Sequence, residues 1–219
     1  MRLRNIKGAK EAVAGSPCCI PMPKELKGLW HTVFLDEHPI HIEIGMGKGQ
    51  FITTLARENP QINYIGIERY ESVLIRALAK ITEQPLDNLK FICMDAREIC
   101  DVFAPNEVNR IYLNFSDPWP KDRHAKRRLT SGAFLALYGQ ILSPDGHIEF
   151  KTDNRGLFDF SLEEIPKAGW RIDAYTLDLH QDPSMNKGNI LTEYEEKFSA
   201  MGNPIFKLTA SCAKTGSLV

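Results

Sequence analysis

Acidic side chains lie at or just after the ends of successive predicted β-strands. They are, in chain order, Glu43, Glu68, Asp95, Asp117 and Asp153. Where parallel strands form an open sheet, ligands bind beyond the carboxyl ends of those strands. A single acid at such a position commonly caps a helix or solubilises a loop. Five acids at one edge of a sheet are harder to explain as caps, and they indicate a binding site.

A glycine loop follows the first of these strands and precedes a helix. Its sequence Gly45-Met46-Gly47-Lys48-Gly49 has the spacing G-x-G-x-G, whereas dinucleotide sites have G-x-G-x-x-G. The glycines alone are a weak signal, because a turn from strand to helix often needs positive φ. The context is stronger, since Glu68 lies about twenty residues further on, as expected of an acid that binds a ribose. Glu68 suits the two ribose hydroxyls, and Asp95 suits an adenine amino group.

Glu43 immediately precedes the glycine loop and limits the choice of ligand. A carboxylate at this place would repel a phosphate that binds at the start of a helix. It suits a ligand that carries an ammonium or a sulfonium group. The site therefore favours S-adenosylmethionine over NAD.

The stretch NFSDPWPKDRHAKRR, residues 114–128, starts as a strand and then turns strongly basic. Its cations, set against the single acid Asp122, are Lys121, Arg123, Lys126, Arg127 and Arg128. A charge run is usually a solvated face. Because this run directly follows Asp117 at a strand end, we expect a polyanion to bind there. Trp119 either stiffens the loop by packing or stacks on a base, and the sequence leaves both open.

The overall composition limits the other possibilities. The net charge is −1, so nucleic-acid binding must come from local clusters of cations. The cysteines form no C-x-x-C pair and the histidines are scattered, so no metal is predicted. The amino terminus lacks the apolar core of a signal peptide, and no apolar run approaches the ~18 residues of a membrane span. We expect a cytoplasmic protein with no membrane association.

Strands alternate with helices along most of the chain, which predicts an α/β fold with a mostly parallel sheet covered on both faces. Strands are expected at 40–44, 63–68, 89–95, 108–115, 147–152, 170–179 and 204–210. Helices are expected from Phe51 to Asn59, over 70–82 and 131–142 (closed by a turn at 144–146), up to Ala168, and from Thr192. Residues 1–30 are expected to be irregular, with a basic arm formed by Arg2, Arg4, Lys7 and Lys10. The predicted organisation is an amino-terminal arm (1–34), one domain (35–212) and a flexible tail (213–219).

Four separate motifs resemble the bacterial tRNA (guanine-N7-)-methyltransferase family: residues 114–128, EIGMGKG at 43–49, KTD at 151–153 and TEYE at 192–195. The resemblance covers roughly Leu35 to Cys212. It implies a Rossmann-like class I methyltransferase fold, a seven-stranded sheet with an antiparallel last strand, and a guanine of the tRNA variable loop as target. It implies S-adenosylmethionine contacts at Glu43, Gly45, Gly47, Gly49, Glu68, Asp95 and Asp117. It implies substrate contacts at Lys121, Asp153, Thr192, Glu193, Tyr194 and Glu195, and RNA contacts at Arg123, His124, Ala125, Lys126, Arg127 and Arg128.

The chemistry of the target assigns a role to Asp117. Guanine N7 carries an in-plane lone pair, so no base is needed before attack, and Asp117 is better suited to orient and to stabilise charge. Thr192 and Glu195 have a second interpretation, because T-x-x-E is also the spacing of a helix capping box. The implied partner is tRNA, and the sequence does not distinguish a monomer from a homodimer.

Three other functions compete with this interpretation. A methylase of amino nitrogens should carry an N/D-P-P-Y/F/W signature, which Ser116-Asp117-Pro118-Trp119 matches only in part. A non-catalytic RNA-binding module would bind nucleic acid without depending on the glycine loop. An NAD-dependent dehydrogenase would bind nicotinamide and ignore RNA.

Overall fold

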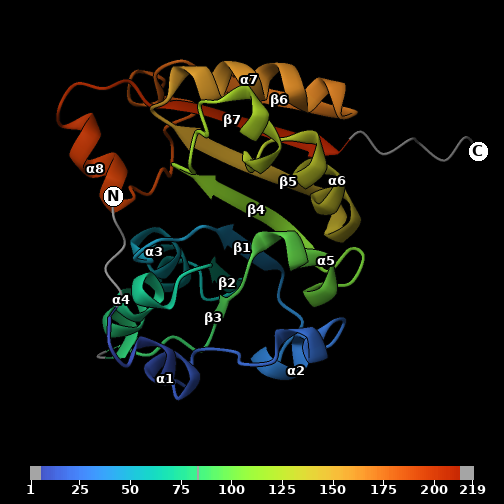
Figure 1. Ribbon diagram of the computed structural model, residues 1–219, viewed down its shortest axis with the longest axis vertical. Helices are drawn as coiled ribbons and strands as arrows, with labels where there is room; N and C mark the ends of the chain where they lie inside the picture. Colours follow the sequence, from blue (N-terminus) through green and yellow to red (C-terminus); the bar gives the residue numbers. More distant parts are fainter. Residues whose placement is uncertain (1–5, 83, 213–219) are drawn as a thin grey trace, which may run out of the picture.

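One seven-stranded sheet organises the molecule, in the strand order β3-β2-β1-β4-β5-β7-β6 (Figure 1). This computed structural model describes residues 6–82 and 84–212. The strands are β1 (Ile40–Ile44), β2 (Asn63–Glu68), β3 (Leu89–Cys93), β4 (Val108–Asn114), β5 (Leu142–Thr152), β6 (Trp170–Thr176) and β7 (Phe206–Cys212). The pairs from β3 across to β5 are parallel, and β7 is antiparallel to both of its neighbours. The predicted fold class, including the antiparallel last strand, is confirmed.

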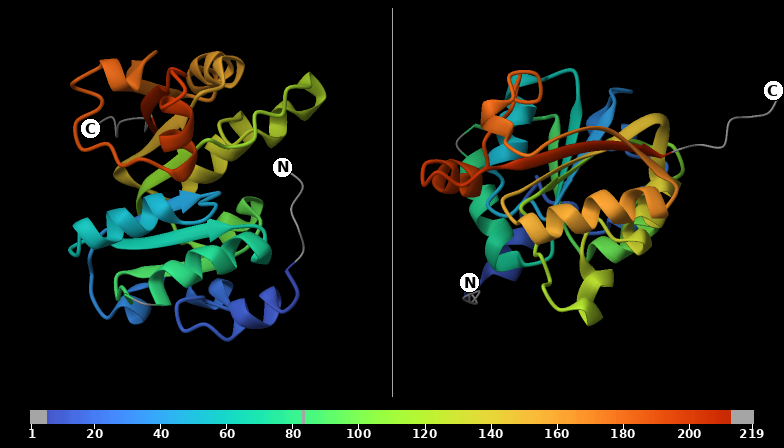
Figure 2. Two further views of the ribbon diagram at one scale, coloured as in Figure 1. Left: turned by 90° about the vertical axis from the view of Figure 1, so that its left-hand side faces the viewer. Right: turned by 90° about the horizontal axis from the view of Figure 1, so that it is seen from above.

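Helices cover both faces of this sheet. The α-helices are α1 (Ala9–Ala14), α2 (His31–Phe34), α3 (Gln50–Glu58), α4 (Glu71–Thr82), α5 (Ile99–Val102), α6 (Gly132–Ile141), α7 (Arg155–Lys167) and α8 (Glu193–Ser199). Short 3₁₀ helices are η1 (Pro23–Leu26), η2 (Ala96–Glu98), η3 (Asp122–Arg127) and η4 (Leu179–Gln181). In Figure 2, α7 runs along β7, and η3 projects from the body of the molecule. Among the described residues, no helix is both long and apolar enough to cross a membrane.

The core is divided by the sheet into two apolar clusters. Successive side chains of a strand point to opposite faces, so Ile65 and Ile67 of β2 enter one cluster while Tyr64 enters the other. The first cluster receives the apolar faces of α6 and α7, and the second receives those of α3 and α4. Every residue of β1 and β2 is buried, including His41 and Glu43, because helices cover both faces of the sheet there.

The amino-terminal segment is more ordered than its sequence predicts. The expectation of an irregular stretch over residues 1–30 is wrong for α1, which packs against α4. Trp30 is fully buried, and its Nε1 donates a hydrogen bond to the Val102 carbonyl at 3.1 Å. Three prolines prevent long elements here, yet Val13 and Trp30 still have apolar surface to bury, and that burial fixes the segment. Arg2, Arg4 and the tail 213–219 lie outside the described residues.

β3 and β4 end at Cys93 and Asn114, before the predicted ends at 95 and 115, and three further strands also differ from their predicted bounds. β5 begins at Leu142, before the predicted turn at 144–146, because Leu142 pairs with Val108 and His147 pairs with Arg110. The intervening residues therefore bulge out of the ladder. β6 ends at Thr176, where its pairing with β7 ends at Lys207, and fully buried Leu179 instead begins η4. β7 is shifted by two residues, spanning Phe206–Cys212 where 204–210 was predicted.

The point where the strand order reverses lies next to β1. β1 pairs with β2 on one side and with β4 on the other, so the connections that leave these strands diverge. In open α/β sheets this divergence creates a crevice at the carboxyl ends. The glycine loop after β1 and the basic stretch after β4 both start at this crevice.

Candidate functional site

The glycine loop owes its shape to left-handed backbone conformations. Gly45, Gly47 and Gly49 have φ values of 74°, 58° and 76°, which only glycine adopts without strain. The Gly45 and Met46 amides donate to the Ile67 carbonyl at 2.8 and 3.2 Å, which fixes the loop over the end of β2. A Cβ on Gly45 or Gly47 would meet no described atom within 4 Å, so the loop leaves room for a ligand to approach its backbone.

Glu43 is a buried acid, and only one of its two carboxyl oxygens has a hydrogen-bond partner among the described residues. Its side chain lies at the end of β1 and is 1% exposed, and Oε1 accepts a hydrogen bond from Asn114 Nδ2 at 2.9 Å. Oε2 has no hydrogen-bond partner among the residues that the structure describes. Burial raises the pKa of Glu43 to about 8, although the Asn114 hydrogen bond and the Lys151 charge oppose the rise. A buried polar atom without a partner is costly, so this oxygen suits a ligand that brings a donor or a positive charge.

Glu68 joins the glycine loop to the start of α4. Its carboxylate accepts hydrogen bonds from the backbone amides of Gly47 (3.2 Å), Arg69 (2.8 Å) and Tyr70 (3.1 Å). Burial raises the pKa of Glu68, and these amide bonds work against that rise. The predicted ribose acid is therefore held rigidly beside the loop, at the end of β2.

Asp95 is paired within the protein. Arg97 donates to it from Nε (2.9 Å) and Nη2 (2.8 Å), and the Arg97 amide donates at 3.0 Å. The Arg97 hydrogen bonds hold the pKa of Asp95 at about 2, against the effect of burial. An adenine amino group that donates to Asp95 would have to share its carboxylate oxygens with Arg97.

The loop around Asp117 has a strained backbone, and the Arg128 side chain holds it. Phe115 and Trp119, two residues before and after Asp117, have φ values of 50° and 41°, and such conformations persist only where the surroundings enforce them. Arg128 provides that support, because its Nε donates to the Pro118 carbonyl (3.0 Å) and Nη2 donates to the Trp119 carbonyl (3.1 Å). Its guanidinium also lies 4.3 Å from the Phe160 ring centroid.

This geometry corrects one sequence prediction. Arg128 was expected to contact RNA with the rest of the basic run, but its side chain is buried and occupied by the loop. The remaining cations Arg123, Lys126 and Arg127 are exposed on η3, which follows exposed Lys121. Half-buried Ala125 and His124 lie among them.

Trp119 is covered by its own segment. The Arg127 guanidinium lies 4.9 Å from the Trp119 ring centroid, and the His124 ring meets it edge-on at 5.7 Å. Of the two interpretations left open by the sequence, packing is the one that the structure shows.

The TEYE motif, residues 192–195, comprises the N-cap and the first residues of α8, and each of its side chains has a different partner. Thr192 caps the helix, because its Oγ1 accepts a hydrogen bond from the Glu195 amide at 2.9 Å. Glu193 forms an ion pair with Lys80. Tyr194 is 41% exposed, donates from its hydroxyl to Asp153 Oδ2 at 3.2 Å, and has its ring 4.9 Å from that of Phe115.

Glu195 fits neither sequence interpretation. Its side chain is fully buried, with Oε2 2.6 Å from Lys151 Nζ and Oε1 accepting from Asn189 Nδ2 at 2.9 Å. Neither oxygen closes a capping box or faces an open site. Lys151, Asn189 and Asn114 are the polar residues that sequence reasoning missed. The available signal was the position of Asn114 and Lys151, at or next to the carboxyl ends of β4 and β5.

Comparison with known proteins identifies the family of this chain. The sequence profile of a family described as "Putative methyltransferase" matches residues 37–208. A Lachnoclostridium phytofermentans protein named tRNA (guanine-N(7)-)-methyltransferase is 61% identical over 210 residues, covering 96% of this chain and 98% of that protein. A Bacillus subtilis protein of the same name is 50% identical, with 94% of this chain and 97% of that protein covered. This chain belongs to the tRNA (guanine-N7-)-methyltransferase family.

Solved structures show that this methyltransferase shares its fold with more distant enzymes. A 16S rRNA methyltransferase, KamB, matches with a TM-score of 0.63 at 13% identity, covering 84% of this chain and 93% of that chain. An antibiotic-related methyltransferase matches with a TM-score of 0.62 at 21% identity, covering 82% and 91%. At these identities the likeness concerns the fold alone.

We predict that Arg128 contributes more to the free energy of unfolding than its neighbour Arg127. Replacing Arg128 with alanine leaves two carbonyls of a strained loop without a charged donor, which should cost about 1.5–3 kcal/mol. Replacing exposed Arg127, which lies over the same tryptophan, should cost about 1 kcal/mol or less. Urea denaturation of both variants measures the difference. Equal losses would show that the Arg128 hydrogen bonds do not hold the loop.

Proposed function

We propose that this methyltransferase transfers the methyl group of S-adenosylmethionine to N7 of a guanine in the tRNA variable loop. One observation carries the proposal. At the carboxyl ends of β1 and β4, Glu43, which has one oxygen without a hydrogen-bond partner among the described residues, lies behind an open glycine loop, and an exposed basic segment follows Asp117. The first site suits a small cationic ligand and the second suits a polyanion. The names of the relatives from L. phytofermentans and B. subtilis support this pairing.

The residues at the crevice fit S-adenosylmethionine, which when bound supplies a methyl group on a sulfonium. Glu43 Oε2 would accept from its ammonium or face its positive charge. Glu68, held by amides, would accept from the ribose, and Asp95 would share its carboxylate with the adenine amino group. Gly45 and Gly47 have the open space that close approach of a ligand to the backbone requires.

Asp117 is proposed to orient the reactants. Because guanine N7 already has a lone pair, no proton has to be removed, and the remaining task is to align the reacting atoms and support a purine that becomes cationic. Asp117 is exposed at the end of β4, and its charge acts on Glu68. Alignment of this kind supplies up to ~7–11 kcal/mol in well-oriented cases.

Asp153 and Tyr194 are proposed to read the guanine. Adenine also has an N7 lone pair, so selection must use the opposite edge, where guanine carries N1–H and an amino group. An acceptor on that edge would be left unpaired by adenine, and such sites reject the wrong substrate by up to ~10⁴–10⁵. Glu195 was expected to share this role, but its contacts with Lys151 and Asn189 leave Asp153, bonded to Tyr194, as the acid beside the crevice. Since the substrate is tRNA, we place the reaction in the cytoplasm.

The proposal predicts a single modified nucleoside. Incubating the purified protein with an unmodified tRNA transcript and S-adenosylmethionine should give 7-methylguanosine, and mass spectrometry of nuclease fragments should place it in the variable loop. Asp117→Asn removes the charge at nearly constant shape and should slow single-turnover transfer about 10²–10³-fold. Asp145→Asn, at an exposed acid in the β5 bulge, is the control and should transfer normally. Methylation of adenine, or of a guanine elsewhere in the tRNA, would contradict the proposal.

We also predict that cofactor binding releases a proton from Glu43. Because the pKa of Glu43 is about 8, its carboxyl is mostly protonated at pH 7. A cationic ligand stabilises the carboxylate and lowers that pKa, so binding at pH 7 should release up to about one proton. Calorimetry in two buffers with different ionisation enthalpies measures the number released. Glu43→Gln should bind more weakly and release none. Equal binding enthalpies of the wild type in both buffers would place the ligand's charge away from Glu43.

The exposed cations of η3 should supply RNA affinity and leave cofactor binding intact. The triple variant Arg123→Ala, Lys126→Ala, Arg127→Ala should weaken tRNA binding and flatten its salt dependence by ~0.7–0.9 in slope for each lost phosphate contact. Arg128 is excluded from this set because it holds the Asp117 loop. The matched control replaces three exposed cations from elsewhere, Lys24, Lys167 and Arg171. An unchanged salt slope in the η3 variant would show that the segment does not touch RNA.

A further inference from the structure

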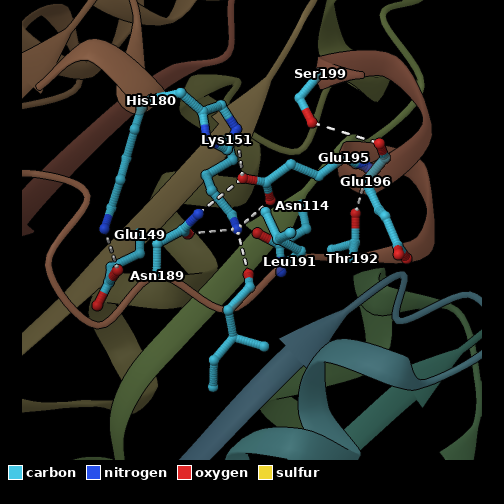
Figure 3. Close-up of polar contacts among 12 residues, drawn as sticks. Asn114, Glu149, Lys151, His180, Asn189, Leu191, Thr192, Glu195, Glu196 and Ser199 are labelled. Carbon is cyan, nitrogen blue, oxygen red and sulfur yellow. Dashed lines mark hydrogen bonds and ion pairs between the residues drawn. The ribbon is translucent and has the colours of Figure 1, made fainter. Parts of the chain in front are cut away.

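A buried lysine on β5 donates three hydrogen bonds, all to one short segment of the chain. Lys151 is 3% exposed, and its ammonium has three donors. Nζ donates to Glu195 Oε2 at 2.6 Å, to the Ile190 carbonyl at 2.9 Å and to Asn189 Oδ1 at 3.0 Å (Figure 3). All three acceptors lie within the seven residues 189–195. The side chain therefore fixes the approach to α8 as well as its first turn.

One strand, β4, lies between this lysine on β5 and the proposed cofactor acid Glu43 on β1. Lys151 is the register partner of Asn114 on β4, and Asn114 donates to Glu43 Oε1 on β1. Its ammonium also lies 4.9 Å from the ring centroid of Phe51 on α3, the helix that follows the glycine loop. A row of polar side chains thus runs from Glu43 through Asn114 and Lys151 to Glu195.

Other contacts tie the segment 189–195 to the same side of the molecule. Gln50 Nε2 donates to the Leu191 carbonyl at 3.4 Å, and Lys80 pairs with Glu193. These ties reach α3 and α4, which are closer to the surface, whereas the Lys151 pair is buried. On the outer side of the segment, Tyr194 meets Asp153 and Phe115.

Folding alone does not account for a buried ion pair at this place. Removing both charges from water is costly, and replacing such a pair with side chains of similar volume is often neutral or stabilising. His180 Nε2 lies 3.4 Å from Glu195 Oε1, so one further titratable group faces the pair. The ion pair fixes the position of the segment 189–195 relative to β5. A positioning role requires such a fixed placement.

We infer that Lys151 is a positioning residue for methyl transfer, which holds segment 189–195, and with it Tyr194, against the cofactor end of the sheet. This inference rests on the proposed function, because it assigns the guanine to Tyr194 and Asp153. Lys151 touches no reacting atom in this arrangement. It acts through the segment, and its loss should misplace Tyr194 while the glycine loop, Glu43 and Glu68 keep their places.

A charge-removal cycle separates positioning from stability. The variants are Lys151→Met, Glu195→Gln and the double variant, in which both charges are absent at similar side-chain volume. The matched control is Lys167→Met with Glu163→Gln, which removes an exposed ion pair on α7. For each variant we would measure the melting temperature, calorimetric S-adenosylmethionine affinity, single-turnover methyl transfer to tRNA, and hydrogen exchange of residues 189–199.

Each single variant should melt at a lower temperature, because one charge is left buried without its partner. The double variant should recover most of that loss. It should nevertheless transfer methyl groups about 100-fold more slowly than the wild type, the cost expected of a small misplacement. Its segment 189–199 should exchange faster, while its S-adenosylmethionine affinity should change far less than its transfer rate. The α7 control should match the wild type in all four measurements.

Two results would overturn the inference. Wild-type transfer and exchange in the recovered double variant would show that the ion pair serves folding alone. A loss of cofactor affinity that accounts for the whole loss of transfer would show that Lys151 acts on the cofactor site. If the wild-type protein does not methylate guanine N7, the proposed function fails. Independently of that result, unchanged hydrogen exchange in the double variant would show that Lys151 does not hold the segment 189–195.

Discussion

The parallel alignment of β3, β2, β1, β4 and β5 gathers the acids of these strands at one edge, where they would repel one another if all were charged and unpaired. The structure relieves this repulsion differently at each strand. Burial keeps Glu43 largely protonated, backbone amides hold Glu68, and Arg97 pairs with Asp95. Asp117, after β4 and next to Glu43 in this row, remains exposed. The methyltransferase thus presents one open negative charge between acids that are already neutralised or bound.

The site is built by parts of the chain that are far apart in sequence. β1, β2 and their following loops supply the small-ligand side, while the loop after β4 and the segment before α8 supply the other side. These two sides meet because β1 and β4 are neighbours in the sheet. The α8 segment is held there by the ion pairs Lys151–Glu195 and Lys80–Glu193. In the proposed function, cofactor recognition would use mainly the amino-terminal half of the chain, and substrate recognition would use the carboxyl-terminal half.

Features with a local cause could be predicted from the sequence, and those decided by distant contacts could not. The alternation of Ile40, Ile42 and Ile44 marks a buried strand, and the glycines of the loop follow from its positive φ values. Charge alone does not reveal which cation of a basic run turns inward, so Arg128 was grouped with its exposed neighbours. The spacing of Thr192 and Glu195 indicates a capping box, but the buried partner of Glu195 lies 44 residues away.

The order of synthesis follows from the position of β7. This last strand lies between β5 and β6, so β6 leaves the ribosome before the strand that joins it to the sheet exists. The chain from β1 to β5 can pair as it emerges, since each of these strands has a neighbour that is already made or comes next in the sheet. β6 must wait for residues 206–212 before it can join the sheet, and the α8 segment is made while that edge of the sheet is still incomplete. The strands of the small-ligand side can therefore pair before the sheet beyond β5 is complete.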